Sequence, residues 1–259
     1  MTNPLRLLGR VLFGIPMIVF GAQYLANGHF AGGLPPVPPW APGGAPAVYF
    51  TGAFLVATGL SILAGVQARF SATILGGFFL LCVVALQAQK FSAIIHDGTA
   101  RTRAFEPLAI GGAAWVLAAL LPADAWSASW NSAIALLAKI GLYLFAFSMV
   151  VFGAQHFMYA PFIAFLIPAW MPAHLFLAYL TGTAMVAAGL AMATGILARS
   201  AGIGLGVMFL LWVILLHAPR VFAKPHNADE WTSLFVAMCM AGCSFILAER
   251  QRKEPCASI

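Results

Sequence analysis

Charged residues are scarce in this sequence. Asp, Glu, Lys and Arg together make up only 8% of the 259 residues, whereas hydrophobic residues make up 62%. A soluble domain carries about 25% charged residues, because its surface must be hydrated. So few charges cannot cover a water-facing surface, which excludes a soluble globular protein. A lipid bilayer must therefore cover much of this chain.

Several sequence motifs are also missing. The sequence contains no G-x-x-x-x-G-K, G-x-G-x-x-G or G-x-S-x-G motif, so phosphate-binding loops and hydrolase nucleophiles find no support. No charged residue lies in the middle of a long apolar run, where ion-coupled transporters usually place ionisable groups. The 13 Lys and Arg residues outnumber the 7 Asp and Glu residues, but they stand singly at the ends of apolar runs. This placement is typical of membrane topology signals and argues against nucleic-acid binding.

Eight apolar runs are long enough to cross a bilayer as helices. A hydrocarbon core of ~30 Å requires about 20 consecutive, mainly apolar residues in a helix. The runs are residues 8–26, 48–66, 70–89, 105–121, 134–157, 175–194, 201–216 and 231–248. They predict an all-α, polytopic membrane protein with about eight transmembrane helices.

The second half of the sequence repeats the first. Residues 19–23 and residues 151–155 both read Val-Phe-Gly-Ala-Gln. Other matches are Pro-x-Trp-x-Pro at residues 38–42 and 168–172, and Tyr-x-Thr-Gly at residues 49–52 and 179–182. A near-constant offset of 130 to 132 residues relates these matches. We therefore predict two four-helix repeats, over residues 1–130 and residues 131–259.

The distribution of Lys and Arg predicts the orientation of both repeats. Each repeat has an even number of spans, so both enter the membrane from the same side, related by a pseudo-twofold axis along the membrane normal. Cytoplasmic loops carry an excess of Lys and Arg. With the N-terminus inside, the larger group of these residues is cytoplasmic: Arg6, Arg10, Arg69, Lys139, Arg199, Arg250, Arg252 and Lys253. We predict a multi-pass protein of a bacterial cytoplasmic (inner) membrane with both termini in the cytoplasm.

This orientation places all six histidines at the outer ends of the spans. His156 ends the fifth span and His217 ends the seventh, so both are expected at the same membrane depth. Their counterparts in the first repeat are Tyr24 and Gln87. The difference predicts a functional pocket in the second repeat, where His156 and His217 approach each other. Gln155 is expected either to line this pocket or to bond to a neighbouring helix.

Four interpretations of these outer polar residues stay open. Interfacial His, Gln, Tyr and Trp side chains anchor helix ends at the membrane boundary. His and Gln also suit a quinone headgroup, whose carbonyl oxygens accept hydrogen bonds above an apolar cleft. Neutral imidazoles ligate metals or haem, but no H-x-x-x-H or H-E-x-x-H motif is present, so no metal site is predicted. The fourth interpretation is a lipid or another apolar ligand.

The segment between the last two apolar runs is polar. Pro219 and Pro225 predict that residues 217–231 form a structured outer loop, because proline interrupts a continuous helix. The segment includes Arg220 and Glu230, which are candidates for binding a polar headgroup. Glu230 also stands where an acidic residue favours a helix N-terminus through the helix dipole.

The motifs of the second repeat resemble those of the DoxX family. They are Phe-Gly-Ala-Gln-His at the end of a first helix, the Pro-x-Trp-x-Pro connector, the Tyr-x-Thr-Gly second helix and the His-x-Pro-Arg exit from a third helix. The resemblance covers residues 8–122 and 134–250. It implies a membrane-bound bundle of four helices per repeat. Some relatives are membrane subunits of thiosulfate:quinone oxidoreductase, and others associate with redox partners in thiol-stress defence. The family's features carry over to His156, His217, Pro219 and Arg220.

These observations predict a membrane subunit of a redox system, such as a quinone-linked oxidoreductase subunit. It would bind quinone, or a similar apolar cofactor, near the outer membrane face, with haem or a metal as the weaker alternatives. His156 and His217 are the candidate catalytic residues, and the candidate cofactor-binding residues are Gln155, Arg220, Trp170 and Glu230. A redox partner protein is expected. The alternative functions are a non-catalytic scaffold or assembly factor for a partner oxidoreductase, and a carrier of lipids or small solutes.

Overall fold

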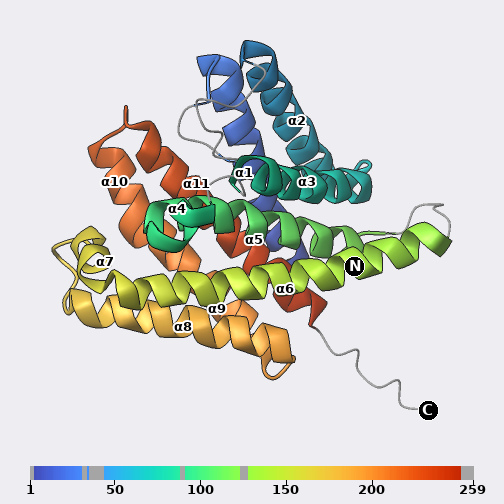
Figure 1. Ribbon diagram of the computed structural model, residues 1–259. Helices are drawn as coiled ribbons and strands as arrows, with labels where there is room; N and C mark the ends of the chain where they lie inside the picture. Colours follow the sequence, from blue (N-terminus) through green and yellow to red (C-terminus); the bar gives the residue numbers. More distant parts are fainter. Residues whose placement is uncertain (1–2, 31–33, 35–43, 88–90, 123–127, 252–259) are drawn as a thin grey trace.

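The computed structural model describes residues 3–30, 34, 44–87, 91–122 and 128–251. Eight helical segments in this part of the chain are long and apolar enough to cross a membrane, which confirms the all-α, multi-pass prediction (Figure 1). They comprise α1 (Pro4–Asn27), α2 (Gly44–Ala64), α3 (Ala68–Cys82), α5 (Gly98–Leu120), α6 (Ala128–Met158), α8 (His174–Thr194), α9 (Ala198–Trp212) and α11 (Ala228–Arg250). The connector predicted at residues 38–42 lies outside the described residues.

Shorter helices lie at the ends of these spans. The α-helical ones are α4 (Phe91–His96), α7 (Ala160–Leu166) and α10 (Ala218–Ala223). Two π-helical segments, η1 (Val83–Gln87) and η3 (Val213–His217), extend α3 and α9 respectively. A π segment bonds i to i+5 and is common at functional sites.

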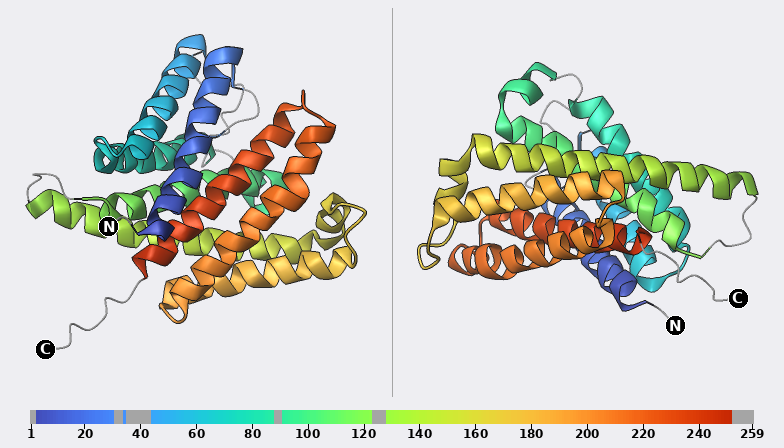
Figure 2. Two further views of the ribbon diagram at one scale, coloured as in Figure 1. Left: turned by 180° about the vertical axis from the view of Figure 1, so that it is seen from behind. Right: turned by 90° about the horizontal axis from the view of Figure 1, so that it is seen from below.

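The long helices pack in two layers. One layer runs in the order α2, α1, α11, α9, and the other in the order α3, α5, α6, α8. Figure 2 shows the helices of one layer crossing those of the other at a steep angle. Contacts of α2 with α3, α5 with α11, and α8 with α9 join the layers. Each layer therefore takes two helices from each repeat, while the sequence boundary near residue 130 stays a prediction.

The burial pattern is that of a protein surrounded by lipid. In α5 and α11, 67% of the apolar window is buried inside the protein, whereas the outer spans bury less than half of theirs. Large apolar side chains on the outer spans are exposed, including Phe50, Leu81, Phe147 and Leu211. In water such exposure would be costly, but a hydrocarbon environment accommodates it. A bilayer is therefore the partner of the outward-facing helix surfaces.

Local backbone features recur at the predicted offset. The turn between α2 and α3 has a positive φ at Gly65 and at Gln67, and the turn between α8 and α9 repeats this at Gly195 and Leu197. The π segments η1 and η3 are also 130 residues apart. Such matched irregularities show that the repeat extends from the sequence to the backbone conformation.

Small residues let the first two helices of each repeat approach closely. A Cβ on Gly21 of α1 would lie 2.5 Å from the carbonyl oxygen of Gly52, and a Cβ on Gly153 of α6 would lie 2.6 Å from that of Gly182. These distances are too short for any real side chain. Backbone approach of this kind is the usual way in which membrane helices associate, because lipid provides no hydrophobic force between them.

Replacement of Gly153 by alanine should therefore destabilise the protein. The added methyl group meets the backbone of α8, which cannot rotate away, so we expect a loss on the order of 2 kcal/mol. Gly204 is a matched control, because a Cβ there meets no atom within 4 Å. Gly204→Ala should leave stability unchanged or raise it slightly through helix propensity. Thermal unfolding in detergent measures both, and equal effects of the two substitutions would contradict the close packing of α6 on α8.

The predicted loop after residue 217 is wrong in its first part. The helix continues through η3 and α10 to Ala223, and Pro219 stands at the start of α10. The proline is tolerated because a first-turn position requires no N–H donor, and the preceding π segment shifts the bonding register. The helix ends only at Lys224, whose backbone leaves the helical region at φ −137° and ψ 64°. Arg220 is consequently held on a helix rather than on a loop.

Candidate functional site

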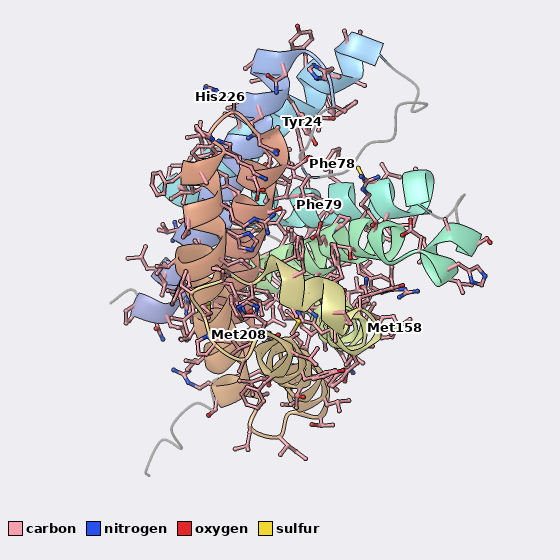
Figure 3. The ribbon with its side chains drawn as sticks, turned by 90° about the vertical axis from the view of Figure 1, so that its left-hand side faces the viewer. Tyr24, Phe78, Phe79, Met158, Met208 and His226 are labelled. Atoms are coloured by element: carbon pink, nitrogen blue, oxygen red, sulfur yellow. The ribbon has the colours of Figure 1, made fainter. Side chains whose placement is uncertain are left out.

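A cleft of about 490 Å³ opens beside α7 and α10. Its walls are mainly apolar, with two polar side chains among them. The lining residues are Phe165, Leu166, Ile167, Pro168, Ala169, His174 and Arg220. Figure 3 views the molecule from the side that carries α7 and α10, with Met158 at the end of α6 and His226 between α10 and α11 labelled. This is the outer face in the predicted topology.

Arg220 is held in the cleft wall by an ion pair with Glu230. Its Nε lies 2.8 Å from Glu230 Oε2, and its Nη2 donates to Glu230 Oε1 at 3.1 Å. The Glu230 side chain is only 7% exposed, whereas that of Arg220 is 33% exposed. One hydrogen bond and one close ion contact orient the guanidinium group, and the carboxylate neutralises its charge. The remaining N–H groups on Nη1 are not used by this pair.

His174 is held by its own connector. Its Nε2 lies 3.0 Å from the carbonyl oxygen of Pro168. A carbonyl oxygen can only accept, so Nε2 must carry the proton in this bond. In the neutral imidazole Nδ1 is then a hydrogen-bond acceptor. The cleft thus offers one cationic donor, Arg220, and, in the neutral form of His174, one acceptor.

His217 lies at the end of η3, one helical turn before Arg220. It is close enough to Arg220 and Glu230 to interact with both charges. Its Nδ1 is buried and makes no hydrogen bond within the described residues. Buried polar atoms nearly always have a partner, so this nitrogen is a candidate for a water or ligand hydrogen bond.

His156 faces a different environment. Its Nδ1 bonds to the carbonyl oxygen of Phe152, one turn earlier in α6, at 2.8 Å. A Cβ on Gly182 of α8 would lie 2.7 Å from the Cβ of His156, so this side chain starts at the α6–α8 contact. The bond to Phe152 leaves Nε2 as the free ring nitrogen of the neutral form. The expected approach of His156 to His217 stays a prediction.

Gln155 bonds to a neighbouring helix, which is one of the two roles expected for it. Its Nε2 donates to the carbonyl oxygen of Gly98 at 2.9 Å and to Thr102 Oγ1 at 3.2 Å, both in α5. Its Oε1 is buried and has no partner among the described residues, and the same holds for Oε1 of Gln23, its counterpart. The amide therefore ties the end of α6 to the start of α5, and only Oε1 is left for a ligand.

The structure groups some predicted residues and separates others. Arg220, Glu230 and His217 lie together at the start of α10. Trp170 stands between α7 and α8, is 65% exposed, and does not line the cleft. No group of three or more His, Cys, Asp and Glu residues in the described part of the chain could hold a metal ion. His174 is not among the predicted site residues. The sequence feature that could have indicated His174 is its difference from the first repeat, which has Gly44 at the corresponding position.

Comparison with known proteins assigns no relative: no family model, curated protein or solved structure matches the chain.

Proposed function

We propose that this protein is the membrane subunit of a redox system and binds a quinone, or a related apolar cofactor, near the outer membrane face. The observation that carries this proposal is the cleft beside α7 and α10. It combines apolar walls with one cationic donor and one neutral acceptor, Arg220 and His174. Ligand sites of this kind are mostly apolar, with a few polar groups that fix the orientation of the ligand.

The charge balance of the cleft favours a neutral ligand. Glu230 neutralises Arg220, so an anionic headgroup would gain little net attraction. A carbonyl oxygen, by contrast, can accept a hydrogen bond from the unused guanidinium N–H groups without disturbing the ion pair. A quinone ring presents such carbonyl oxygens and has an apolar tail that suits the apolar walls. Quinones are therefore favoured over phospholipids as the ligand class.

His174 is suited to the proton transfer that accompanies quinone chemistry. A quinone supplies reversible redox chemistry coupled to protons. The neutral His174 ring can accept a hydrogen bond, and then a proton, from a hydroxyl group of the reduced ligand through Nδ1. The fixed bond from Nε2 to Pro168 holds the ring in the tautomer that this role requires. His217, with its unpartnered Nδ1, is a second group for moving a proton near Arg220.

The redox role requires a partner. We propose that a soluble or membrane-bound oxidoreductase exchanges electrons with the bound ligand, which agrees with the resemblance to the DoxX family. A scaffold without a ligand is the alternative function. It gains support from the extensive burial of α5 and α11 at the centre of the molecule.

Binding of a short-chain quinone to the purified protein in nanodiscs tests this proposal. The double variant Arg220→Gln/Glu230→Gln removes the oriented guanidinium but keeps the site neutral, so it does not leave a buried charge. We expect its quinone Kd to rise about tenfold, the effect of losing one or two buried hydrogen bonds. Lys224→Gln removes an exposed cation just after α10 and should leave the Kd unchanged.

Two outcomes would decide between the functions. Saturable quinone binding that weakens only in the double variant supports the proposal. No saturable binding by the native chain, together with a stoichiometric copurifying oxidoreductase, would favour the scaffold.

We also propose the predicted orientation, with both termini in the cytoplasm of a bacterial cell. The inner end of the fold carries a polar network around Glu249, whose side chain is 3% exposed. Asn3 Nδ2 donates to both of its oxygens at 2.9 and 3.0 Å, and Arg6 and Arg199 lie 3.7 Å away. Clusters of arginine resist translocation. In a chain with its four cysteines replaced by alanine, Arg250→Cys should resist membrane-impermeant thiol reagents in intact cells, and labelling of this variant from outside would contradict the orientation.

A further inference from the structure

The fourth helix of each repeat packs against the first helix of the other repeat. A Cβ on Gly112 of α5 would lie 2.5 Å from the carbonyl oxygen of Gly141 in α6. A Cβ on Gly242 of α11 would lie 3.0 Å from the carbonyl oxygen of Gly9 in α1. Gly242 matches Gly112 at an offset of 130, and Gly141 matches Gly9 at an offset of 132. The two crossings are therefore equivalent.

Side chains above and below these crossings also join the repeats. Phe105 of α5 contacts Phe147 of α6 with ring centroids 5.6 Å apart, and Phe235 of α11 contacts Phe20 of α1 at 6.4 Å. The Gln155 amide bonds to α5 at the outer end. At the inner end Asn3 and Arg6 bond to Glu249, which joins the start of α1 to the end of α11.

The first and fourth helices of the same repeat do not form such an interface. Among the described residues, the helix pairs with extensive packing include α1 with α11 and α5 with α6, but neither α1 with α5 nor α6 with α11. Each fourth helix packs on the third helix of its own repeat, α5 on α3 and α11 on α9, and also on the first helix of the other repeat, as at the interface of a symmetric dimer. In such an arrangement the interface is the same surface used twice.

We propose that the two repeats act as two subunits within one chain, and that the glycine faces of α5 and α11 are docking surfaces for the first helix of another four-helix repeat of the same kind. The peptide link over residues 122–127 is then dispensable for assembly. The interface is held instead by backbone approach at the glycines, by the Gln155 bonds between α6 and α5, and by the bonds of Asn3 and Arg6 to Glu249 between α1 and α11.

Cleavage of the folded chain tests this inference. A protease site inserted within residues 123–127 allows the purified full-length protein to be cut after it has folded in detergent. We expect the two fragments to co-elute in size-exclusion chromatography at the elution volume of the uncut protein. Separation of the fragments under the same conditions would overturn the inference.

Cross-linking identifies which helices hold the cleaved fragments together. In a chain with its four cysteines replaced by alanine, Phe105→Cys/Phe147→Cys places one thiol on each fragment across the α5–α6 contact. A short bis-thiol reagent should join the fragments in this variant. The matched control is Phe20→Cys/Phe105→Cys. Its two thiols would be neighbours only if α1 packed on α5, so the reagent should not cross-link them. Cross-linking within the Phe20/Phe105 pair, but not between the fragments, would overturn the proposed packing of the two repeats.

Discussion

Replacement of Gly141 by leucine should nearly abolish the recovery of folded protein. A Cβ at this position would meet the carbonyl oxygen of Gly112 at a distance that real atoms do not reach, with the Gly112 carbonyl carbon at 2.9 Å and its Cα at 3.1 Å. All three are backbone atoms, so no side-chain rotation relieves the contact. Overpacking of buried sites typically costs about 1–3 kcal/mol and more where the backbone must move. We expect the larger value here, since the helices can separate only by breaking the α5–α6 interface.

The control for this variant is Gly204→Leu. Gly204 also lies within a long helix, but a Cβ there has no neighbour within 4 Å. The leucine should therefore add an apolar side chain to the lipid-facing surface and leave the yield of monodisperse protein unchanged. Similar yields for Gly141→Leu and Gly204→Leu in size-exclusion chromatography would contradict the close crossing of α5 and α6.

Removal of Arg220 alone should be the second most damaging change. Arg220→Ala leaves the nearly buried Glu230 carboxylate without its ion-pair partner. Breaking a buried ion pair by removing one member typically costs about 3–5 kcal/mol. Arg220 is partly exposed, so water can reach the site, and we expect on the order of 3 kcal/mol. The measured quantity is the loss of thermal stability in detergent.

The double variant Arg220→Ala/Glu230→Ala separates the unpaired charge from the lost contact. Without the carboxylate no buried charge remains, so the double variant should be more stable than Arg220→Ala. The coupling free energy between the two substitutions should be a large fraction of the stability lost in Arg220→Ala. Arg101→Ala is the matched control. Arg101 lies at the start of α5 and donates to the backbone carbonyl oxygens of Ile94 and Ile95, so it leaves no charge behind. An equal loss for Arg101→Ala and Arg220→Ala would contradict the role assigned to the ion pair.

The spans and the repeat could be predicted because both depend on local sequence. Apolar length decides whether a helix crosses the bilayer, and the motif offset decides which helices are equivalent. The packing of each fourth helix on the first helix of the other repeat could not be predicted in this way. Gly9 and Gly242 make the same local contact that Gly112 and Gly141 make, and the sequence would look the same if each first helix packed on the fourth helix of its own repeat. Only the three-dimensional arrangement distinguishes these possibilities.

The candidate site could be predicted only in part. Arg220 and Glu230 stand on either side of a turn, so their pairing follows from the short connection between α10 and α11. The prediction for residues 217–231 was wrong because Pro219 was expected to end the helix, whereas η3 accommodates it. His174 enters the cleft through the path of the α7–α8 connector, which no periodicity reveals. Trp170, from the same connector, lies outside the cleft lining.

Photolabelling with an azido-substituted quinone is the most direct test of the proposed function. The full-length protein in nanodiscs is illuminated with the probe, and labelled peptides are identified by mass spectrometry. We expect labelling of residues 165–174 and of the α10 segment around Arg220, reduced by excess unlabelled quinone. Labelling spread over the lipid-facing residues, such as Leu81 and Leu211, that unlabelled quinone does not reduce would contradict a quinone site in this cleft.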